Sequence, residues 1–213
     1  MNFIDESLMD YVEKHSTPES EVLKYINRET HLKVLRPTML AGHFQGQLLK
    51  MLSMMNKPKR VLEIGTFTGY SAICLAQGLT ENGLLYTIDA NHELEELIKS
   101  NIQKAGLSNK IKLIIGQAID VIPAIKDTFD LIYIDADKEN LINYYEMLIP
   151  MTNPNGIIIV DNVLWYGKVV ETIAPNDIQT IAIDNFNKLV ANDNRVENVI
   201  IPVRDGLNVI RKN

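Results

Sequence analysis

Acidic and amide side chains follow two apolar stretches of this 213-residue chain. Asp135 comes directly after the run 131–134. Asp161 and Asn162 come directly after the run 157–160. Two carboxylates and one amide oxygen, without histidine or thiol, suit a hard cation: Mg²⁺ foremost, with Ca²⁺ or Mn²⁺ as alternatives. Asp and Asn are also common turn residues, so the pair at 161–162 taken alone could simply end a strand.

A glycine-containing turn follows a third apolar run. Gly65 and Gly69 stand four positions apart, after residues 61–64. The dinucleotide fingerprint G-x-G-x-x-G would need glycine where Phe67 and Tyr70 stand, because the backbone must approach a pyrophosphate. The preceding Glu63 adds a negative charge, which would attract a cationic group and repel a phosphate. The turn therefore favours a cofactor without phosphates, unless its glycines serve the turn alone.

Two further residues have positions that suit a nucleoside. Asp89 ends the next apolar run, where a carboxylate can accept both hydroxyls of a ribose. Ala118 lies in the sequence Gly-Gln-Ala after the run 111–115, where it could flank an adenine. A solvated acid at a strand end is the alternative for Asp89.

An alternation of strands and helices after Pro58 must position these residues. We expect strands at 60–64, 84–88, 111–115, 129–134 and 157–160, and helices at 70–78, 92–105, 118–125 and 139–148. Turn residues 153–156 precede the fifth strand. Such alternation predicts an α/β fold with a Rossmann-like, doubly wound parallel sheet. The carboxyl ends of its strands then share one ligand-binding edge.

The last part of the chain breaks the alternation. After a helix at 177–192, we expect strands at 196–203 and 207–211 around a turn at 204–206. Strands this close in sequence can pair only as an antiparallel hairpin, because a parallel partner needs a long crossover. The predicted sheet is therefore seven-stranded and mostly parallel, with a C-terminal antiparallel hairpin strand. An all-parallel dinucleotide fold would lack that strand.

Residues 1–57 are expected to be N-terminal helices, and residues 58–213 the Rossmann-like core of one domain. One helix is expected to start at 16–19, where a hydroxyl cap precedes proline and an acid, and another to cover 42–55. The chain has a net charge of −6 and one cysteine. It shows no basic and apolar signal segment and no apolar run of bilayer length, so we expect a cytoplasmic protein.

In combination, these motifs resemble those of the cation-dependent class I S-adenosylmethionine (SAM) O-methyltransferases, typified by the catechol and caffeoyl-CoA enzymes. The resemblance covers the chain from about Arg36 to the final hairpin. It rests on Leu62-Glu63-Ile64-Gly65 with Gly69-Tyr70-Ser71, Ile88-Asp89, Asp135-Ala136-Asp137-Lys138 and Asp161-Asn162-Val163-Leu164-Trp165. It implies a SAM pocket formed by Ala41, Glu63, Gly65, Ser71, Asp89, Ala118 and Asp137. It also implies a homodimer.

The resemblance implies a role for Lys138, three residues after Asp135. A dication would hold two adjacent oxygens of an acceptor and favour the ionised one. Lys138 would then act as general base or stabilise the phenolate, and the alternative is a solvated lysine at a helix start. Trp165 and Tyr166 could form an aromatic wall for a flat acceptor, or pack within their loop.

The sequence therefore predicts metal-dependent methylation of a hydroxyl on a small aromatic acceptor, catechol-like or caffeoyl-like. One alternative is O-methylation of a hydroxylated uridine in tRNA, which the acidic balance weakly disfavours. A nicotinamide-dependent oxidoreductase is opposed by Phe67 and Tyr70 at fingerprint positions. A non-catalytic binding module is opposed by the intact metal ligands and Lys138. Membrane partners are not expected.

Overall fold

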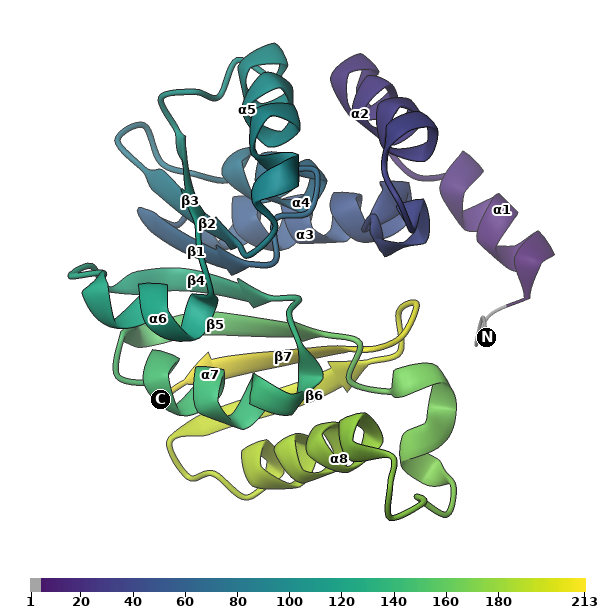
Figure 1. Ribbon diagram of the computed structural model, residues 1–213, viewed down its shortest axis with the longest axis vertical. Helices are drawn as coiled ribbons and strands as arrows, with labels where there is room; N and C mark the ends of the chain where they lie inside the picture. The colour runs from purple at the N-terminus through teal and green to yellow at the C-terminus, as the bar shows by residue number, and fades with distance from the viewer. Residues whose placement is uncertain (1–4) are drawn as a thin grey trace.

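The computed structural model describes residues 5–213, and a seven-stranded sheet forms its centre (Figure 1). The strand order is β3-β2-β1-β4-β5-β7-β6. The strands are β1 (Arg60–Ile64), β2 (Leu84–Asp89), β3 (Ile111–Ile115), β4 (Phe129–Ile134), β5 (Thr152–Asp161), β6 (Val196–Ile201) and β7 (Leu207–Lys212). The first five pair in parallel, and β7 pairs antiparallel with both β5 and β6. The predicted fold class, including the terminal antiparallel strand, is confirmed.

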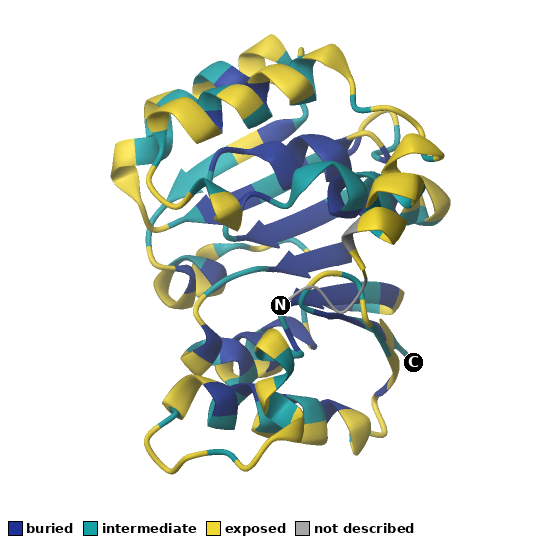
Figure 2. Cartoon of the chain, turned by 90° about the vertical axis from the view of Figure 1, so that its right-hand side faces the viewer, coloured by how far each residue is buried: buried dark blue, intermediate teal, exposed yellow. Residues whose placement is uncertain are grey.

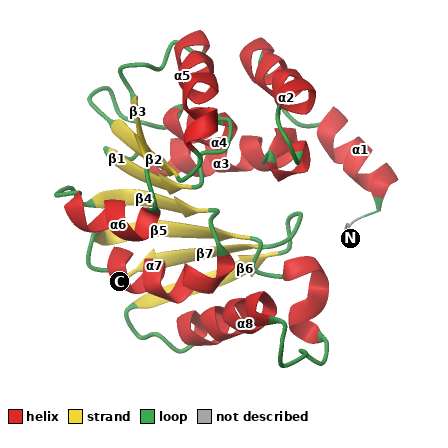
Figure 3. Cartoon of the chain, in the orientation of Figure 1, coloured by secondary structure: helices red, strands yellow, loops and turns green. Residues whose placement is uncertain are grey.

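Helices cover both faces of the sheet (Figure 3). Successive side chains of a strand point to opposite faces, so Val61 packs with one helical layer and Leu62 with the other. One layer contains α3 (Gly42–Asn56), α4 (Tyr70–Ala76) and α5 (Glu95–Lys104). The other contains α6 (Ala118–Val121), α7 (Leu141–Leu148) and α8 (Ile178–Ala191). Figure 2 shows buried strands between helices with exposed outer faces.

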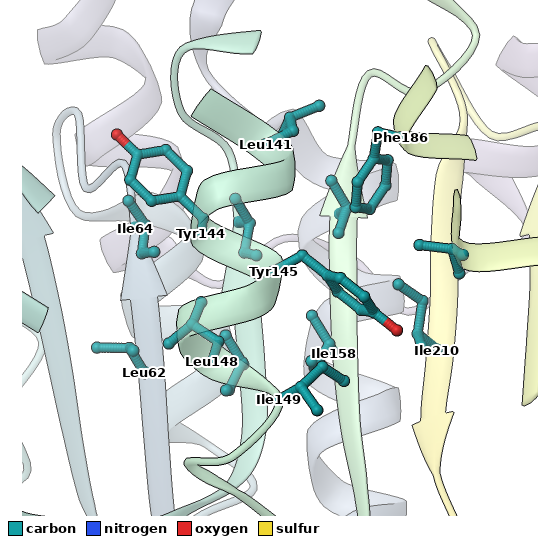
Figure 4. Packing of buried hydrophobic residues seen from close by; sticks show 14 of the residues in the cluster. Leu62, Ile64, Leu141, Tyr144, Tyr145, Leu148, Ile149, Ile158, Phe186 and Ile210 are labelled. Carbon is teal, nitrogen blue, oxygen red and sulfur yellow. The ribbon is translucent and has the colours of Figure 1, made fainter. Parts of the chain in front are cut away.

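The layer of α7 and α8 is held by large side chains (Figure 4). Tyr145 of α7 meets Phe186 of α8 edge-on, with ring centroids 5.8 Å apart. Both rings are fully buried, and burying one such ring contributes about 2–3 kcal/mol. Ile158 and Ile210 of the neighbouring strands β5 and β7 belong to the same cluster. This packing fixes the end of β5, which carries Asp161.

The N-terminal helices α1 (Glu6–Lys14) and α2 (Glu21–Lys33) lead through the short helix η1 (Pro37–Met39) into α3. Thr30 of α2 donates a hydrogen bond to the hydroxyl of Thr68 in the glycine turn, at 2.9 Å. α2 therefore lies against the turn. No helix within residues 5–213 is both long and apolar enough to cross a membrane. The expectation that the chain shows no signal segment also covers residues 1–4, which lie outside the described part.

The predicted helix start at 16–19 is wrong. The Ser16 hydroxyl instead donates back to the carbonyl of Val12 at 2.7 Å, in the turn that ends α1. Glu19 precedes α2 and accepts a hydrogen bond from the hydroxyl of Tyr70 at 2.5 Å. The local capping signal was thus outweighed by contacts with the preceding helix and with α4.

The predicted turn at 153–156 is also wrong, because β5 already begins at Thr152. Thr152 pairs with Phe129, and the register shifts before Leu131 pairs with Ile157. Asn155 lies in this irregular stretch with a positive φ of 63°. The turn residues therefore form a bulge within the strand.

Candidate active site

The ends of β1 and β4 meet at the point where the chain reverses its order across the sheet. The chain runs outward from β1 to β3 and then crosses back to β4 on the other side of β1. The backbone N–H of Asp135 donates to the carbonyl of Ile64 at 2.8 Å. A Cβ atom on Gly65 would lie 1.9 Å from the carbonyl oxygen of Asp135, and Gly65 has a φ of +96°. Only glycine fits here, and open α/β sheets bind ligands at such a switch point.

The predicted carboxylate ligands are brought together at this edge. β4 and β5 pair in register up to Ile134 and Val160, so Asp135 and Asp161 follow in adjacent positions. Burial and the charge of Asp161 raise the pKa of Asp135 above its usual range, while Lys138 opposes the shift. Two carboxylates at this edge therefore repel each other, which is what a bound cation would relieve.

Lys138 lies between these two strand ends. Its side chain is only 6% exposed, and its Nζ is 3.5 Å from Oδ1 of Asp135. Nζ also donates to the backbone carbonyl of Asp161 at 3.2 Å. The alternative of a solvated lysine is therefore wrong.

Sequence reasoning missed two residues that hold Asp161. The hydroxyl of Tyr133, in β4, donates to Oδ2 of Asp161 at 2.6 Å. The Nε2 of Gln45, in α3, donates to the same oxygen and to the Tyr133 hydroxyl. The only sequence signal was the position of Gln45, which shares the helix face of Leu49, four residues later.

The donor set fits a hard dication. Asp135, Asp161 and Asn162 offer two carboxylates and an amide oxygen, and Asn162 has a left-handed backbone with a φ of 59°. Its N–H donates to Oδ1 of Asp161 at 2.7 Å. Within residues 5–213, no cluster of three or more His, Cys, Asp and Glu side chains offers another metal site.

Glu63 gives the glycine turn a buried carboxyl group. The side chain is fully buried, and its Oε2 accepts a hydrogen bond from Thr87 at 2.5 Å. Its Oε1 has no hydrogen-bond partner. Burial raises the pKa of Glu63 to about 8. An unpartnered, buried carboxylate oxygen fits a positively charged ligand group.

The other predicted cofactor residues lie at the starts of helices and the ends of strands. Asp89 ends β2, and its Oδ2 accepts a hydrogen bond from the backbone N–H of Phe67 at 2.6 Å. This bond holds Asp89 at the glycine turn. Oδ1 of Asp137 accepts a hydrogen bond from the hydroxyl of Tyr144 at 2.6 Å. Ser71 and Ala118 are buried in the first turns of α4 and α6.

Ala41 is the predicted cofactor residue from the N-terminal part of the chain. It precedes α3 and lines a cavity of about 370 Å³ beside the N-terminal helices. The described lining contains no other predicted cofactor residue. Arg204, in the turn between β6 and β7, lines the same cavity and donates to the carbonyl of Ala41. Arg204 thus connects Ala41 to the turn between β6 and β7.

Trp165 and Tyr166 follow the acidic strand end in the short helix η5 (Trp165–Val170). Trp165 packs against the core, and its ring centroid is 5.6 Å from that of Tyr166. Tyr166 is 56% exposed, and its N–H donates to Asp205 at 2.5 Å. Tyr166 is thus free to contact an acceptor, while Trp165 also serves packing.

A sheet with six strands running one way and a penultimate strand against them is the architecture of Rossmann-like methyltransferases. The model of a family described as O-methyltransferase matches residues 13–213. Caffeoyl-CoA O-methyltransferase 2 from Populus trichocarpa is 38% identical over 208 residues, which cover 91% of this chain and 83% of that relative.

Two solved structures are similar over almost the whole chain. The O-methyltransferase from Bacillus cereus in complex with SAH has a TM-score of 0.88 at 28% identity, and 97% of both chains is covered. The O-methyltransferase TomG from Streptomyces achromogenes in complex with SAM also has a TM-score of 0.88, at 27% identity, covering 97% of this chain and 96% of that one. This chain belongs to the O-methyltransferase family and is a SAM-dependent enzyme. These likenesses do not favour the tRNA or nicotinamide alternatives.

Proposed function

We propose that this enzyme methylates one hydroxyl of a vicinal pair on a small aromatic acceptor, catechol-like or caffeoyl-like, with the help of a divalent cation. The observation that carries the proposal is the pairing of Asp135 and Asp161 at adjacent strand ends, with the buried Lys138 between them. The similarity to a caffeoyl-CoA O-methyltransferase supports the class of acceptor.

Asp135, Asp161 and Asn162 would hold the cation. When bound, a dication supplies a fixed orientation for two acceptor oxygens and lowers the cost of ionising one of them. Lys138 takes the proton from the reacting hydroxyl when its Nζ is neutral, and stabilises the phenolate when Nζ is charged. Its Nζ lies within 3.5 Å of both ligand residues. Tyr166 is exposed beside this edge and would contact the aromatic ring.

The cofactor residues would fix the methyl donor for an in-line displacement, in which alignment accounts for much of the rate. Asp89 is held at the glycine turn, where it can accept ribose hydroxyls. Glu63 meets the positive charge that SAM carries. The remaining proposed contacts come from Ala41, Gly65, Ser71, Ala118 and Asp137.

SAM binding at pH 7 is expected to release close to one proton. Burial raises the pKa of Glu63 to about 8 in the free enzyme, so its carboxyl is mostly protonated at pH 7. A cationic ligand favours the ionised form, so affinity should rise with pH by up to roughly tenfold per unit below pH 8 and then level off. Calorimetry in two buffers of different ionisation enthalpy measures the release.

The variant Glu63→Gln should lose this proton release, whereas Glu93→Gln, at an exposed acid, should keep it. Identical binding heats in both buffers for the wild-type protein would contradict the role of Glu63.

The proposed function is tested by a screen of acceptors with a labelled methyl donor. Catechols, caffeoyl esters, flavonoids and tRNA carrying a hydroxylated uridine are each assayed with Mg²⁺, with EDTA, and with Mg²⁺ restored. We expect transfer to aromatic acceptors with vicinal hydroxyls, lost in EDTA and recovered with the metal. A rate that EDTA leaves intact would exclude a catalytic metal, and transfer to tRNA alone would replace the proposed acceptor.

We also propose that residues 1–213 form one domain and that two copies associate. Apolar side chains exposed on the N-terminal part support the association: Leu32, Leu35, Met39, Met51 and Met55.

A further inference from the structure

Two buried side chains donate hydrogen bonds to a single oxygen of Asp161. The hydroxyl of Tyr133 reaches Oδ2 at 2.6 Å, and Nε2 of Gln45 donates to the same atom. Gln45 also donates to the Tyr133 hydroxyl at 3.0 Å, so the three groups form a closed triangle. The other oxygen, Oδ1, accepts the N–H of Asn162 at 2.7 Å. The two oxygens of this carboxylate are therefore not equivalent.

A count of lone pairs shows what remains for a cation. Each carboxylate oxygen offers about two acceptor positions. The two donors occupy both positions on Oδ2 of Asp161, and the backbone of Asn162 occupies one on Oδ1. One position on Oδ1 stays open. We propose that Tyr133 and Gln45 restrict Asp161 to a one-oxygen contact with the cation and so select Mg²⁺ or Mn²⁺ over Ca²⁺. This inference rests on the proposed metal site.

A one-oxygen contact separates Mg²⁺ from Ca²⁺ because the two cations differ in the number and arrangement of oxygen ligands that they take. Ca²⁺ takes six to eight oxygens and often binds both oxygens of a carboxylate, whereas Mg²⁺ demands a near-octahedral set of six. Binding of both Asp161 oxygens would displace Tyr133 or Gln45 from Oδ2. A displaced donor would stay buried without a partner, which is costly.

Neither donor has room to move away. Tyr133 is fully buried near the carboxyl end of β4, where it pairs with Glu63 on one side and Ile159 on the other. Gln45 is 1% exposed and lies on α3, in the layer packed on the sheet. Both residues act through Asp161 and are positioning residues.

The test measures metal affinity without any acceptor. Dissociation constants for Mg²⁺, Mn²⁺ and Ca²⁺ are determined by calorimetry on the wild-type protein and on Tyr133→Phe, which keeps the ring and removes the donor. We expect the ratio of the Ca²⁺ constant to the Mg²⁺ constant to fall about five- to tenfold in the variant, as one hydrogen bond no longer opposes two-oxygen binding. Gln45→Met should lower the ratio in the same direction.

Tyr145→Phe is the matched control. Tyr145 is equally buried, and its hydroxyl donates to Asp193 at 2.8 Å, at a position remote in the sequence from the strand-end ligands. Tyr145→Phe removes the same kind of hydroxyl group from the core as Tyr133→Phe. A general loss of stability would therefore appear in both variants. The affinity ratio should stay at the wild-type value.

A crystal structure of the wild-type protein with Mn²⁺ gives an independent readout, in which the metal should contact Oδ1 of Asp161 and not Oδ2. Contact through both oxygens would overturn the inference even if Tyr133→Phe failed to fold. A wild-type protein that binds no dication would overturn both the metal site and the inference. Tight metal binding with an unchanged ratio in Tyr133→Phe and Gln45→Met would overturn the inference alone.

Discussion

Replacement of Asp161 by alanine is expected to abolish metal-dependent methyl transfer. Asp161 contributes one of the two carboxylates at the paired ends of β4 and β5, and Asp135 and Asn162 alone would leave one carboxylate and one amide. A dication held by so few protein oxygens binds weakly, and an acceptor hydroxyl then loses both its orientation and the charge that favours its ionisation. The rate should fall to that of wild-type enzyme in EDTA. Initial rates and Mg²⁺ calorimetry measure the two losses.

This substitution also leaves the hydroxyl of Tyr133 buried without its acceptor, so stability must be separated from catalysis. Asp193→Ala is a matched control, because it removes the acceptor of the Tyr145 hydroxyl in the same way. Each substitution is expected to cost about 1–3 kcal/mol of folding free energy. Only Asp161→Ala should lose Mg²⁺ binding. A variant that kept EDTA-sensitive turnover would show that Asp161 does not hold the metal.

Two acidic side chains lie side by side at this edge. Glu63 lies at the end of β1, and Asp135 at the end of the adjacent β4. The charge of Asp135 adds to burial in raising the pKa of Glu63. A cation at either place would lower the repulsion felt at the other. The geometry therefore favours a cationic methyl donor and a dication side by side, which is the arrangement that the proposed reaction needs.

Much of the sheet could be predicted from the sequence, because strands buried on both faces are continuous apolar runs. The bounds expected for β1, β3 and β4 match the structure. Turn chemistry was less informative. The residues at 153–156 favour a turn, yet pairing of Thr152 with Phe129 keeps them in β5. The ladder resumes only at Ile157, so the turn preference appears as an irregular stretch within the strand and not as its boundary.

The same limit applies to the site. Asp135 and Asp161 could be predicted because each follows an apolar run, and parallel strands bring such ends to one edge. The roles of Gln45 and Tyr133 could not be predicted, because a single polar residue in a buried helix or strand does not indicate its hydrogen-bond partner. The hydrogen bond from Gln45 to Asp161 joins residues that are 116 positions apart in the chain. The burial of Lys138 was likewise a property of packing and not of sequence pattern.

Replacement of Lys138 by alanine is expected to reduce turnover by about 10²-fold or more, the usual contribution of a positioned base. Lys138 is buried, and its Nζ lies at 3.5 Å from Oδ1 of Asp135 and 3.2 Å from the carbonyl of Asp161. The acceptor oxygen held by these ligands would lie within its reach. SAM affinity should change little, since the Lys138 side chain is not among the proposed cofactor contacts. Single-turnover rates at saturating SAM measure the effect.

A second substitution separates the two roles proposed for Lys138. Arginine keeps the positive charge but cannot give up its proton under these conditions. If Lys138 acts as base, Lys138→Arg should be as slow as Lys138→Ala, whereas partial recovery would assign it to phenolate stabilisation. Lys168→Ala, at a lysine that is 48% exposed, should retain full turnover. Wild-type turnover in Lys138→Ala would remove this side chain from the chemistry, and the metal ligands alone would then have to ionise the acceptor.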